Sequence, residues 1–274
     1  MTFADTIAVL LENGALEAAR QATQDQVKAA PGDRLARHLY IDLLILSGSY
    51  ERADVQCNLA TTLSPEDAVG FGLLRHQLRA MAAREAWFGH GAIPQFIGEP
   101  SQREQDSLRL AVAIREQAFD EAVGFLAELD ALDEPLRFEV SGKFVDFLRD
   151  GDDRTPYILE VLTTGGGYLW VGFDRIAALD PEPLTRPRDY AFRPARLTLH
   201  DGASASVLLP AIYNGTPEDE TMLLARQTVW EQDVPGLTFG RGQRCLFAGD
   251  ELVPLHELAN LRALAGDAGM TPHG

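Results

Sequence analysis

Cysteine is scarce in this sequence of 274 residues, which holds only Cys57 and Cys245 and no CxxC pair. Without closely spaced cysteines a disulfide framework is not expected, and a reducing compartment is the default setting. Basic residues are also few, because 24 Lys and Arg stand against 41 Asp and Glu, for a formal net charge of -17. Residues 1–132 hold 19 acids and 11 bases, and residues 133–274 hold 22 and 13. Neither half is basic, so nucleic acid and an anionic membrane surface are not expected partners.

Long apolar runs are absent as well. A membrane-spanning helix needs about 18 or more consecutive apolar residues, and the sequence has no such run. The first residues, MTFADTIAVLLENG, carry acids where a secretory signal peptide needs bases, and their apolar residues are spaced rather than continuous. We therefore expect a cytoplasmic protein with an ordinary hydrophobic core, since 46% of its residues are hydrophobic.

Familiar catalytic and metal-binding motifs are missing too. GxSxG and HExxH do not occur, and none of the 6 histidines follows another at the helical i, i+4 spacing of a zinc site. The segment DGDDRTPYILEV begins like a calcium loop at Asp150 and Asp152. It has Thr155 where that loop needs glycine, and Val161 where it needs a bidentate Glu. We expect no catalytic residue, no metal and no cofactor.

Three isolated side chains remain candidates for a catalytic role. Cys245 stands beside Arg244, His90 is in the expected loop FGHGAIP, and His256 is in an expected strand. A nucleophilic thiol needs a base nearby, which the sequence does not show, so we favour packing roles for Cys245 and for Cys57. A small hydrolase or transferase with an unrecognised site in the second half stays an alternative.

A repeat of 34 residues runs through the first half. The segments NGALEAARQATQDQVKAAPGD and SGSYERADVQCNLATTLSPED align Gly14 with Gly48 and Ala19 with Ala53. The further pairs are Leu16 and Tyr50, Thr23 and Cys57, Val27 and Thr61, and Pro31 and Pro65. This is the period of tetratricopeptide (TPR) hairpins, in which a glycine ends one helix and a small residue lets the pair approach closely. Residues 1–132 are therefore predicted to form a helical repeat (TPR-like) domain.

The helices of this half carry their own signals. Thr2 with Asp5, and Ser101 with Glu104, have the spacing of capping boxes. The segment RLARHLYIDLLILS is apolar nearly all round, which indicates a buried central helix. A long helix over residues 67–88 is expected to pack through Val69, Leu73, Leu78, Met81 and Phe88. The segment FDEAVGFLAEL closes the half.

Residues 133–274 change character, and short runs of branched and aromatic residues replace the helical period. YLWVGF, ARLTL, SASVLLPAIY, QRCLFA and LVPLHEL are predicted strands. HDG and the glycines of TTGGGYLW predict hairpin turns, and the prolines favour edges and bends. Short helices are expected at GKFVDFLRD and ETMLLARQTVW. The predicted fold class is α+β, with a helical repeat domain at 1–132 followed by a mostly antiparallel β-rich α+β domain at 133–274.

The segment FGRGQRCLFAGDELVPLHEL, residues 239–258, has the glycines of a phosphate-binding loop. Such a loop needs a helix after its glycines, with the helix N-terminus facing the anion. Here apolar and polar residues alternate after the glycines, which indicates a strand. We predict a hairpin with Gly249 and Asp250 at its turn, and Arg241 and Arg244 pairing with acids.

Several segments together resemble a known family. They are LLENGALEAARQATQDQVKAAPGD, GGGYLWVGFDRI, RDYAFRPARLTL followed by VLLPAIY, and GRGQRCLFAGDELVPLHEL. Over nearly its whole length the chain is similar to the ImpE family, also called TagJ, of bacterial type VI secretion accessory proteins. Gly172 stands where the family pattern has proline. The strongest marks of the resemblance are Tyr168, Trp170, Phe173, Arg175, Ile176, Gly242, Gln243, Arg244, Gly249, Asp250, Glu251 and Pro254.

The resemblance implies a cytoplasmic, non-enzymatic accessory protein of the secretion machine. It implies binding to the small, TssB-like subunit of the contractile sheath through that subunit's N-terminal helix, and a role in handling or recycling contracted sheath. Helical repeats commonly offer a groove to a helix, which favours the first half as the binding half. Exposed edge strands of the second half could also capture a partner. A further rival is a repeat-type chaperone for a secreted effector.

Overall fold

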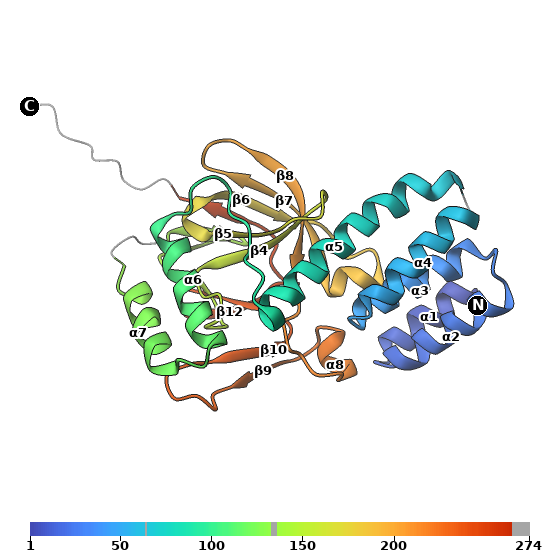
Figure 1. The fold of residues 1–274 in the computed structure, drawn as a ribbon, viewed down its shortest axis with the longest axis horizontal. Helices are drawn as coiled ribbons and strands as arrows, with labels where there is room; N and C mark the ends of the chain where they lie inside the picture. Colours follow the sequence, from blue (N-terminus) through green and yellow to red (C-terminus); the bar gives the residue numbers. More distant parts are fainter. Residues whose placement is uncertain (64, 133–135, 265–274) are drawn as a thin grey trace, which may run out of the picture.

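The computed structural model describes residues 1–63, 65–132 and 136–264. Its first half is helical and its second half consists mainly of antiparallel sheets, which confirms the predicted α+β class (Figure 1). The principal helices are α1 Phe3–Glu12, α2 Leu16–Ala29, α3 Arg34–Leu46, α4 Tyr50–Leu63, α5 Ala68–His90, α6 Gln102–Arg115 and α7 Phe119–Asp130. A short 3-10 turn, η1 Pro65–Asp67, precedes α5.

The helices pair as hairpins through one kind of left-handed turn. Gly14 follows α1 with a φ of 79°, and Gly48 follows α3 with a φ of 69°. The next backbone N–H in each turn bonds to the carbonyl five residues earlier, as in a Schellman motif. The turn between α6 and α7 has the same bonds with Gln117 at a φ of 60°. The capping boxes at Thr2 and Ser101 are confirmed.

The small residues of the repeat lie where the helices touch. Ala19 and Ala53 are fully buried, and so are Thr23 and Cys57, which align in the repeat. Because neither alanine carries a side chain beyond Cβ, the paired helices can approach closely. The central helix α3 is buried on almost every side, as its composition predicts.

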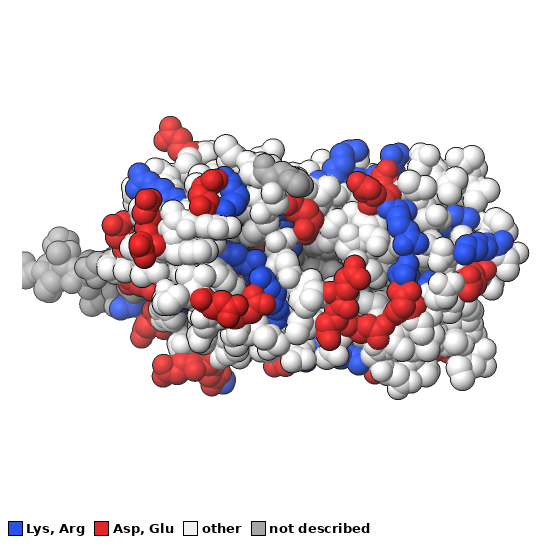
Figure 2. All heavy atoms as spheres, turned by 60° about the horizontal axis from the view of Figure 1, so that its bottom comes forward, with Lys and Arg blue, Asp and Glu red and all other residues white. Residues whose placement is uncertain are grey.

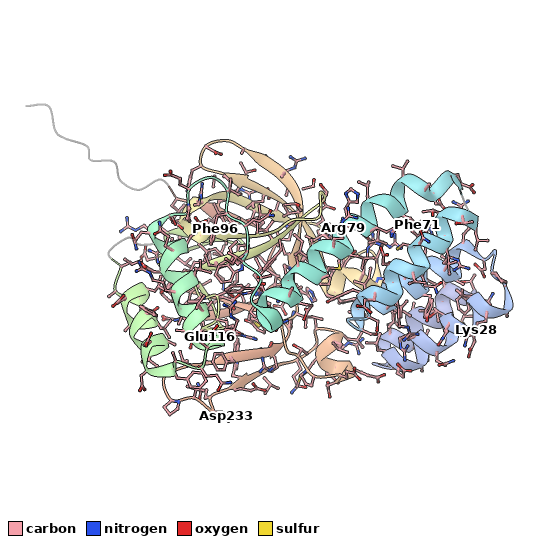
Figure 3. The ribbon with its side chains drawn as sticks, in the orientation of Figure 1. Lys28, Phe71, Arg79, Phe96, Glu116 and Asp233 are labelled. Carbon is pink, nitrogen blue, oxygen red and sulfur yellow. The ribbon has the colours of Figure 1, made fainter. Side chains whose placement is uncertain are left out.

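The predicted packing face of α5 is wrong in its first turns. Val69 and Leu73 are 78% and 53% exposed, while Phe71 and Leu74 are buried. The face is set by α3, because the ring of Phe71 stacks on His38 with 4.7 Å between ring centroids. Figure 3 labels Phe71 on this helix. The second half of the pattern is confirmed, since Leu78 and Met81 are buried.

An eight-stranded antiparallel sheet forms the centre of the second half, in the order β2-β1-β13-β6-β7-β8-β4-β5. The predicted HDG and glycine turns join β7 to β8 and β4 to β5. Its strands are β1 Phe138–Val140, β2 Lys143–Val145, β4 Ile158–Thr163, β5 Tyr168–Gly172, β6 Ile176–Pro181, β7 Phe192–Leu199, β8 Ser204–Pro210 and β13 Leu261–Ala263. The 3-10 turns η2 Phe173–Arg175 and η3 Pro187–Tyr190 precede β6 and β7.

Two smaller sheets lie beside the large one. They contain β9 Thr228–Glu231 with β10 Phe239–Gly242, and β3 Leu148–Asp150 with β11 Cys245–Ala248 and β12 Glu251–Pro254. The hairpin predicted at Gly249 and Asp250 is confirmed, because β11 pairs with β12 across this turn.

The helix predicted at GKFVDFLRD is wrong, since this segment forms β2 and β3. Ser141 and Gly142 have φ values of 50° and 86° and reverse the chain, so that β2 pairs with β1. The four apolar residues of the segment suit a strand as well as a helix. The segment ETMLLARQTVW is a helix only over α8 Glu220–Leu223 and then continues into β9.

Two hydrophobic cores hold the molecule together, and each combines helices with strands. The first joins the buried faces of α1–α5 to Ile158, Trp170 and Phe192 of the large sheet. The second joins α6 and α7 to alternate residues of the same strands, such as Leu159 and Val171. The strands β4 and β5 therefore present one face to each core. A domain boundary near residue 132 stays a prediction. Among the described residues, no helix has both the length and the apolar character needed to cross a bilayer.

Candidate functional site

A cleft lies between the helical hairpins and the sheets. It consists of two adjoining hollows of about 290 and 520 Å³ that share Ser47, Glu218 and Leu223. The turn between α3 and α4, the last part of α5, the start of β7, the loop 212–218 and α8 form its walls. Elements from both halves of the chain are needed to make it.

The cleft combines an apolar floor with an acidic border. Tyr50, Phe192 and Leu223 provide apolar surface. Glu85 and Glu218 line it with exposed carboxylates, alongside further charged residues that include Glu17, Arg20, Arg52, Arg84 and Glu220. Figure 2 shows a hollow near the middle of one face of the molecule, with acidic side chains along one border and basic side chains beside the other. An amphipathic polypeptide with basic flanks has the matching chemistry.

A short segment of the second half, residues 217–226, reaches back to the first hairpin, and we call it the strap. A carboxylate oxygen of Glu220 accepts a hydrogen bond of 2.6 Å from the backbone N–H of Glu17, at the start of α2. Arg226 donates to the carbonyls of Leu11 and Glu12 at 2.6 and 3.0 Å, at the end of α1. Each charge suits the helix end that it meets, since N–H groups face the acid and carbonyls face the base.

Beneath the cleft, a buried acid holds two arginines. Glu160 of β4 accepts a hydrogen bond of 2.8 Å from Arg84 Nε, and it also pairs with Arg244. Tyr168 donates to it at 2.6 Å, and Trp170 Nε1 donates to the Tyr168 hydroxyl at 2.7 Å. Burial by itself raises the pKa of the Glu160 carboxyl, but the guanidinium groups of Arg84 and Arg244 hold that pKa well below its usual range. Glu160 is therefore ionised, and it fixes both arginines.

A second acid extends this network toward the small sheets. Arg244 Nε lies 3.2 Å from Asp150 Oδ2, and the Tyr213 hydroxyl donates to Asp150 Oδ1 at 2.8 Å. Burial raises the pKa of the Asp150 carboxyl to about 6, although Arg244 opposes the shift. The network connects β3 and β4 to the residue that precedes β11, at the base of the cleft.

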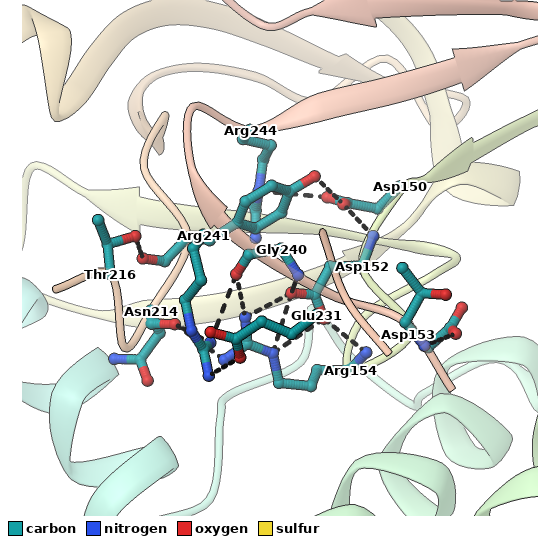
Figure 4. A network of polar contacts seen from close by, with 12 residues as sticks. Asp150, Asp152, Asp153, Arg154, Asn214, Thr216, Glu231, Gly240, Arg241 and Arg244 are labelled. Atoms are coloured by element: carbon teal, nitrogen blue, oxygen red, sulfur yellow. Dashed lines mark hydrogen bonds and ion pairs between the residues drawn. The ribbon is translucent and has the colours of Figure 1, made fainter. Parts of the chain in front are cut away.

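Asp152 and Arg154 carry the network on to the β9–β10 pair (Figure 4). Asp152 accepts from the N–H of Gly240 at 2.8 Å and pairs with Arg154, whose Nη2 also donates to the Gly240 carbonyl at 3.1 Å. Arg241 pairs with Glu231 at 2.8 Å. The acids that begin like a calcium loop are thus bound to arginines and backbone amides. The predicted acid pairing of Arg241 and Arg244 is confirmed.

The positions that carry the family resemblance fall into separate groups. Tyr168, Trp170 and Arg244 meet at Glu160, and Arg175 pairs with Glu104 at 3.2 Å. Of the others, Phe173 and Ile176 belong to the second core, Gly242 ends β10 and Gln243 follows it, and Gly249, Asp250, Glu251 and Pro254 lie in the β11–β12 hairpin. Among these positions, Tyr168, Trp170 and Arg244 are connected to the cleft. They surround Glu160, which also pairs with Arg84, and Arg84 lines the cleft. A functional role for these positions stays a prediction.

Sequence reasoning missed the central acid of this network. Glu160 is the single charged residue in the segment YILEVL, and a lone acid among five apolar residues signals a buried ion pair. Its partners Arg84 and Arg244 are 76 and 84 positions away, so no local pattern links them.

Cys245 and His256, two of the candidates for a catalytic role, have separate surroundings. Cys245 is buried, its sulfur lies 3.4 Å from the Thr228 hydroxyl, and burial raises the pKa of the thiol to about 11. His256 lies in a turn rather than a strand, its ring packs on Tyr190, and burial lowers its pKa to about 4. His90 is the last residue of α5 rather than part of a loop. Neither Cys245 nor His256 lines the cleft.

Known proteins match both the sequence and the fold. The family model described as ImpE protein matches residues 142–262. The type VI secretion system accessory component TagJ of Pseudomonas aeruginosa is 30% identical over a match of 266 residues, and the coverage is 91% of this chain and 89% of TagJ. The crystal structure of protein VPA1032 from Vibrio parahaemolyticus has a TM-score of 0.87 at 25% identity, and the match covers 95% of this chain and 98% of that one. Because the similarity to TagJ extends over nearly the full length of both proteins, the chain belongs to the ImpE/TagJ family of type VI secretion accessory proteins.

Proposed function

We propose that the protein is a cytoplasmic adaptor without enzymatic activity, which binds the N-terminal helix of the small sheath subunit of a type VI secretion system. The observation that carries the proposal is the cleft, with its apolar floor and acidic border. A helix that lacks its own core buries its apolar face in such a groove through anchors at i, i+3, i+4 and i+7. The relative TagJ is named as an accessory component of this secretion system, which supports the proposal that this protein works with the same machine.

The floor and the border have separate parts in this binding. Tyr50 and Leu223 offer contact to apolar anchors and supply most of the affinity, and Phe192, which is 3% exposed, supports this floor from the core. Glu85 and Glu218 favour basic residues beside the anchors, which speeds the encounter more at low salt than at high salt. The buried pair of Arg84 and Glu160 keeps the wall of α5 in place, so little ordering is needed when the helix arrives.

Isothermal titration of the full chain with a synthetic peptide of that helix tests the proposal. We expect a dissociation constant in the micromolar range, about -8 kcal/mol. The full chain is required because the first core includes Ile158 and Phe192, which a fragment of residues 1–132 would lack.

A matched pair of variants locates the site. Leu223→Gln removes an apolar contact from the cleft and should weaken binding about tenfold, since a buried leucine contributes about 1.5 kcal/mol or more. Leu252→Gln makes the same change at an exposed position of β12 and should leave the affinity unchanged. Thermal unfolding of both variants checks that they stay folded.

Three outcomes would count against the proposal. No heat and no co-elution with the full chain would contradict binding of this helix. Equal affinity for a peptide with the same residues in scrambled order would contradict recognition of an apolar face. Binding that neither the cleft change nor higher salt weakens would place the peptide elsewhere, for example on an exposed strand edge.

A further inference from the structure

A separate pocket of about 180 Å³ opens between the end of α5 and the end of α6. Trp87, Phe88 and Ile114 form its apolar walls, and Arg115 and Arg154 bring guanidinium groups to it, so we call it the arginine pocket. Asn214 borders both this pocket and the cleft, and its side-chain amide donates to Glu85 at 2.9 Å. The pocket therefore adjoins the cleft, and the hydrogen bond between Asn214 and Glu85 lies at their border.

The walls of the arginine pocket are already held in place. The guanidinium carbon of Arg115 lies 4.8 Å from the centroid of the Trp87 ring, and that of Arg154 lies 5.6 Å from the Phe88 ring. Trp87 also packs edge-on against Trp170, with 5.1 Å between ring centroids. Because cation–π and ring contacts fix the walls, a ligand would need little further ordering of the site.

The two arginines differ in their remaining capacity to bind an anion. Arg154 is engaged by Asp152 and by the carbonyls of Asn214 and Gly240. Arg115 has an ion pair of 3.5 Å with Glu116, whose side chain is 66% exposed and which Figure 3 labels at the end of α6. The Nη1 atom of Arg115 is buried and has no hydrogen-bond partner. That atom is shielded from solvent, but the Arg115 side chain as a whole is 25% exposed and its ion-pair partner is an exposed acid, so the guanidinium group keeps the capacity to bind a carboxylate.

We propose that the arginine pocket binds a carboxylate carried on a short apolar or aromatic body. A carboxylate matches the planar fork of a guanidinium group, and Arg115 is the less engaged of the two arginines. Trp87, Phe88 and Ile114 would cover the apolar body, and a volume of about 180 Å³ suits a single side chain. Arg154 is paired with the buried Asp152, whereas Arg115 is paired only with the exposed Glu116, so Arg115 is the main positive charge at the pocket. Two sources have this chemistry, a free carboxylic acid and the C-terminal residue of a polypeptide.

The first test compares 3-phenylpropanoate with its uncharged amide by NMR of the full-length protein, following the indole N–H signal of Trp87. We expect the acid to bind with a dissociation constant of about a millimolar, as for a small fragment, and about tenfold more tightly than the amide. Arg115→Gln should abolish this preference for the acid. Arg109→Gln removes a 59% exposed arginine from the same helix and should leave it unchanged.

A second comparison identifies the source of the carboxylate. A tripeptide ending in phenylalanine with a free C-terminus, compared with its amidated form, represents a polypeptide end. Binding of the free tripeptide supports a polypeptide, and binding of 3-phenylpropanoate alone supports a small acid. Equal binding of acid and amide, or an unchanged preference in Arg115→Gln with native melting behaviour, would overturn the proposal. This test is independent of the proposed binding of the sheath helix. A peptide that binds the cleft should have the same affinity for Arg115→Gln as for the parent protein.

Discussion

At the scale of single residues, Gly242 shows why some positions tolerate one amino acid only. Its φ is 83°, in the left-handed region, and a Cβ atom there would overlap the carbonyl oxygen of Gln227. The carbonyl of Gly242 also accepts a hydrogen bond of 2.9 Å from the N–H of Tyr213. The residue therefore brings the chain close to two other backbone segments at once, for which only glycine has the space.

Replacing Gly242 with alanine should lower the free energy of unfolding by about 3 kcal/mol, from left-handed strain together with the steric overlap. Gly202→Ala is the matched control, because Gly202 has a φ of 87° but open space where its Cβ would be. That variant should lose only about 1 kcal/mol. Urea denaturation of both proteins measures the difference, and equal losses would show that the contact with Gln227 does not matter.

Asp150 predicts a dependence of stability on pH. Burial raises its pKa to about 6, from an ordinary value of 3.8. Between these values the folded protein binds a proton that the unfolded chain has released, so the free energy of unfolding falls as the pH rises from about 4 to 6. Asp150→Asn removes this contribution. Relative to the variant, the parent protein should lose up to about 3 kcal/mol across this range.

Chemical denaturation of both proteins at several pH values tests this prediction. His256, whose pKa burial lowers to about 4, contributes a slope of opposite sign in the same range. It is present in both proteins and therefore cancels in the difference. Parallel stability curves for the parent and Asp150→Asn would mean that Asp150 does not titrate in this range.

At the scale of elements, the features predicted correctly from the sequence are those that depend on residues close together in the chain. The hairpin turns at Gly14 and Gly48 and the capping box at Ser101 are local signals, and all three are present. Residues 142–150 were predicted wrongly because their apolar spacing suits both helix and strand. The choice is made by the reversal at Gly142 and by pairing with β1. Glu104 was found as a capping residue, but its second contact, with the N–H of Gly172, comes from 68 positions away.

Close approach of the paired helices can be tested at Ala53. Its side chain is fully buried, so Ala53→Leu should overpack the helix contact and cost about 1–3 kcal/mol of folding free energy. Ala18→Leu makes the same change at an exposed position of α2 and should have little effect. Thermal unfolding compares the two variants. A neutral Ala53→Leu would mean that the hairpin contact can widen freely.

At the scale of the whole molecule, long-range contacts decide how the halves are joined. The Arg84–Glu160–Arg244 network and the strap both connect segments more than 70 positions apart. Neither could be predicted from the sequence, because partner choice at such distances depends on the complete packing. The same limit applies to the candidate site: its charged and apolar residues are visible in the sequence, but their meeting in one cleft is not.

The strap gives a prediction for dynamics. The double variant Glu220→Ala, Arg226→Ala removes the bonds to Glu17, Leu11 and Glu12. Hydrogen exchange of α1 and α2 should then become faster, because the first hairpin loses its attachment to the second half, while β4 and β7 keep their protection. Mass spectrometry resolves the two regions. Arg196→Ala, which removes an exposed contact to Ser204, is the control. Uniform acceleration in all elements would indicate global destabilisation instead.

The sharing of the first core between helices and strands has a consequence for synthesis on the ribosome. Helices α1–α5 are complete at His90, but their core also needs Phe192 and Ile212, and Ile212 follows about 120 residues later. At roughly 5–20 residues per second, translation takes about 6–24 s to supply them. During this interval the nascent hairpins expose apolar surface that the sheet will later cover. Cellular holdases that bind such surfaces are therefore expected to engage the growing chain until β7 and the following loop leave the ribosome.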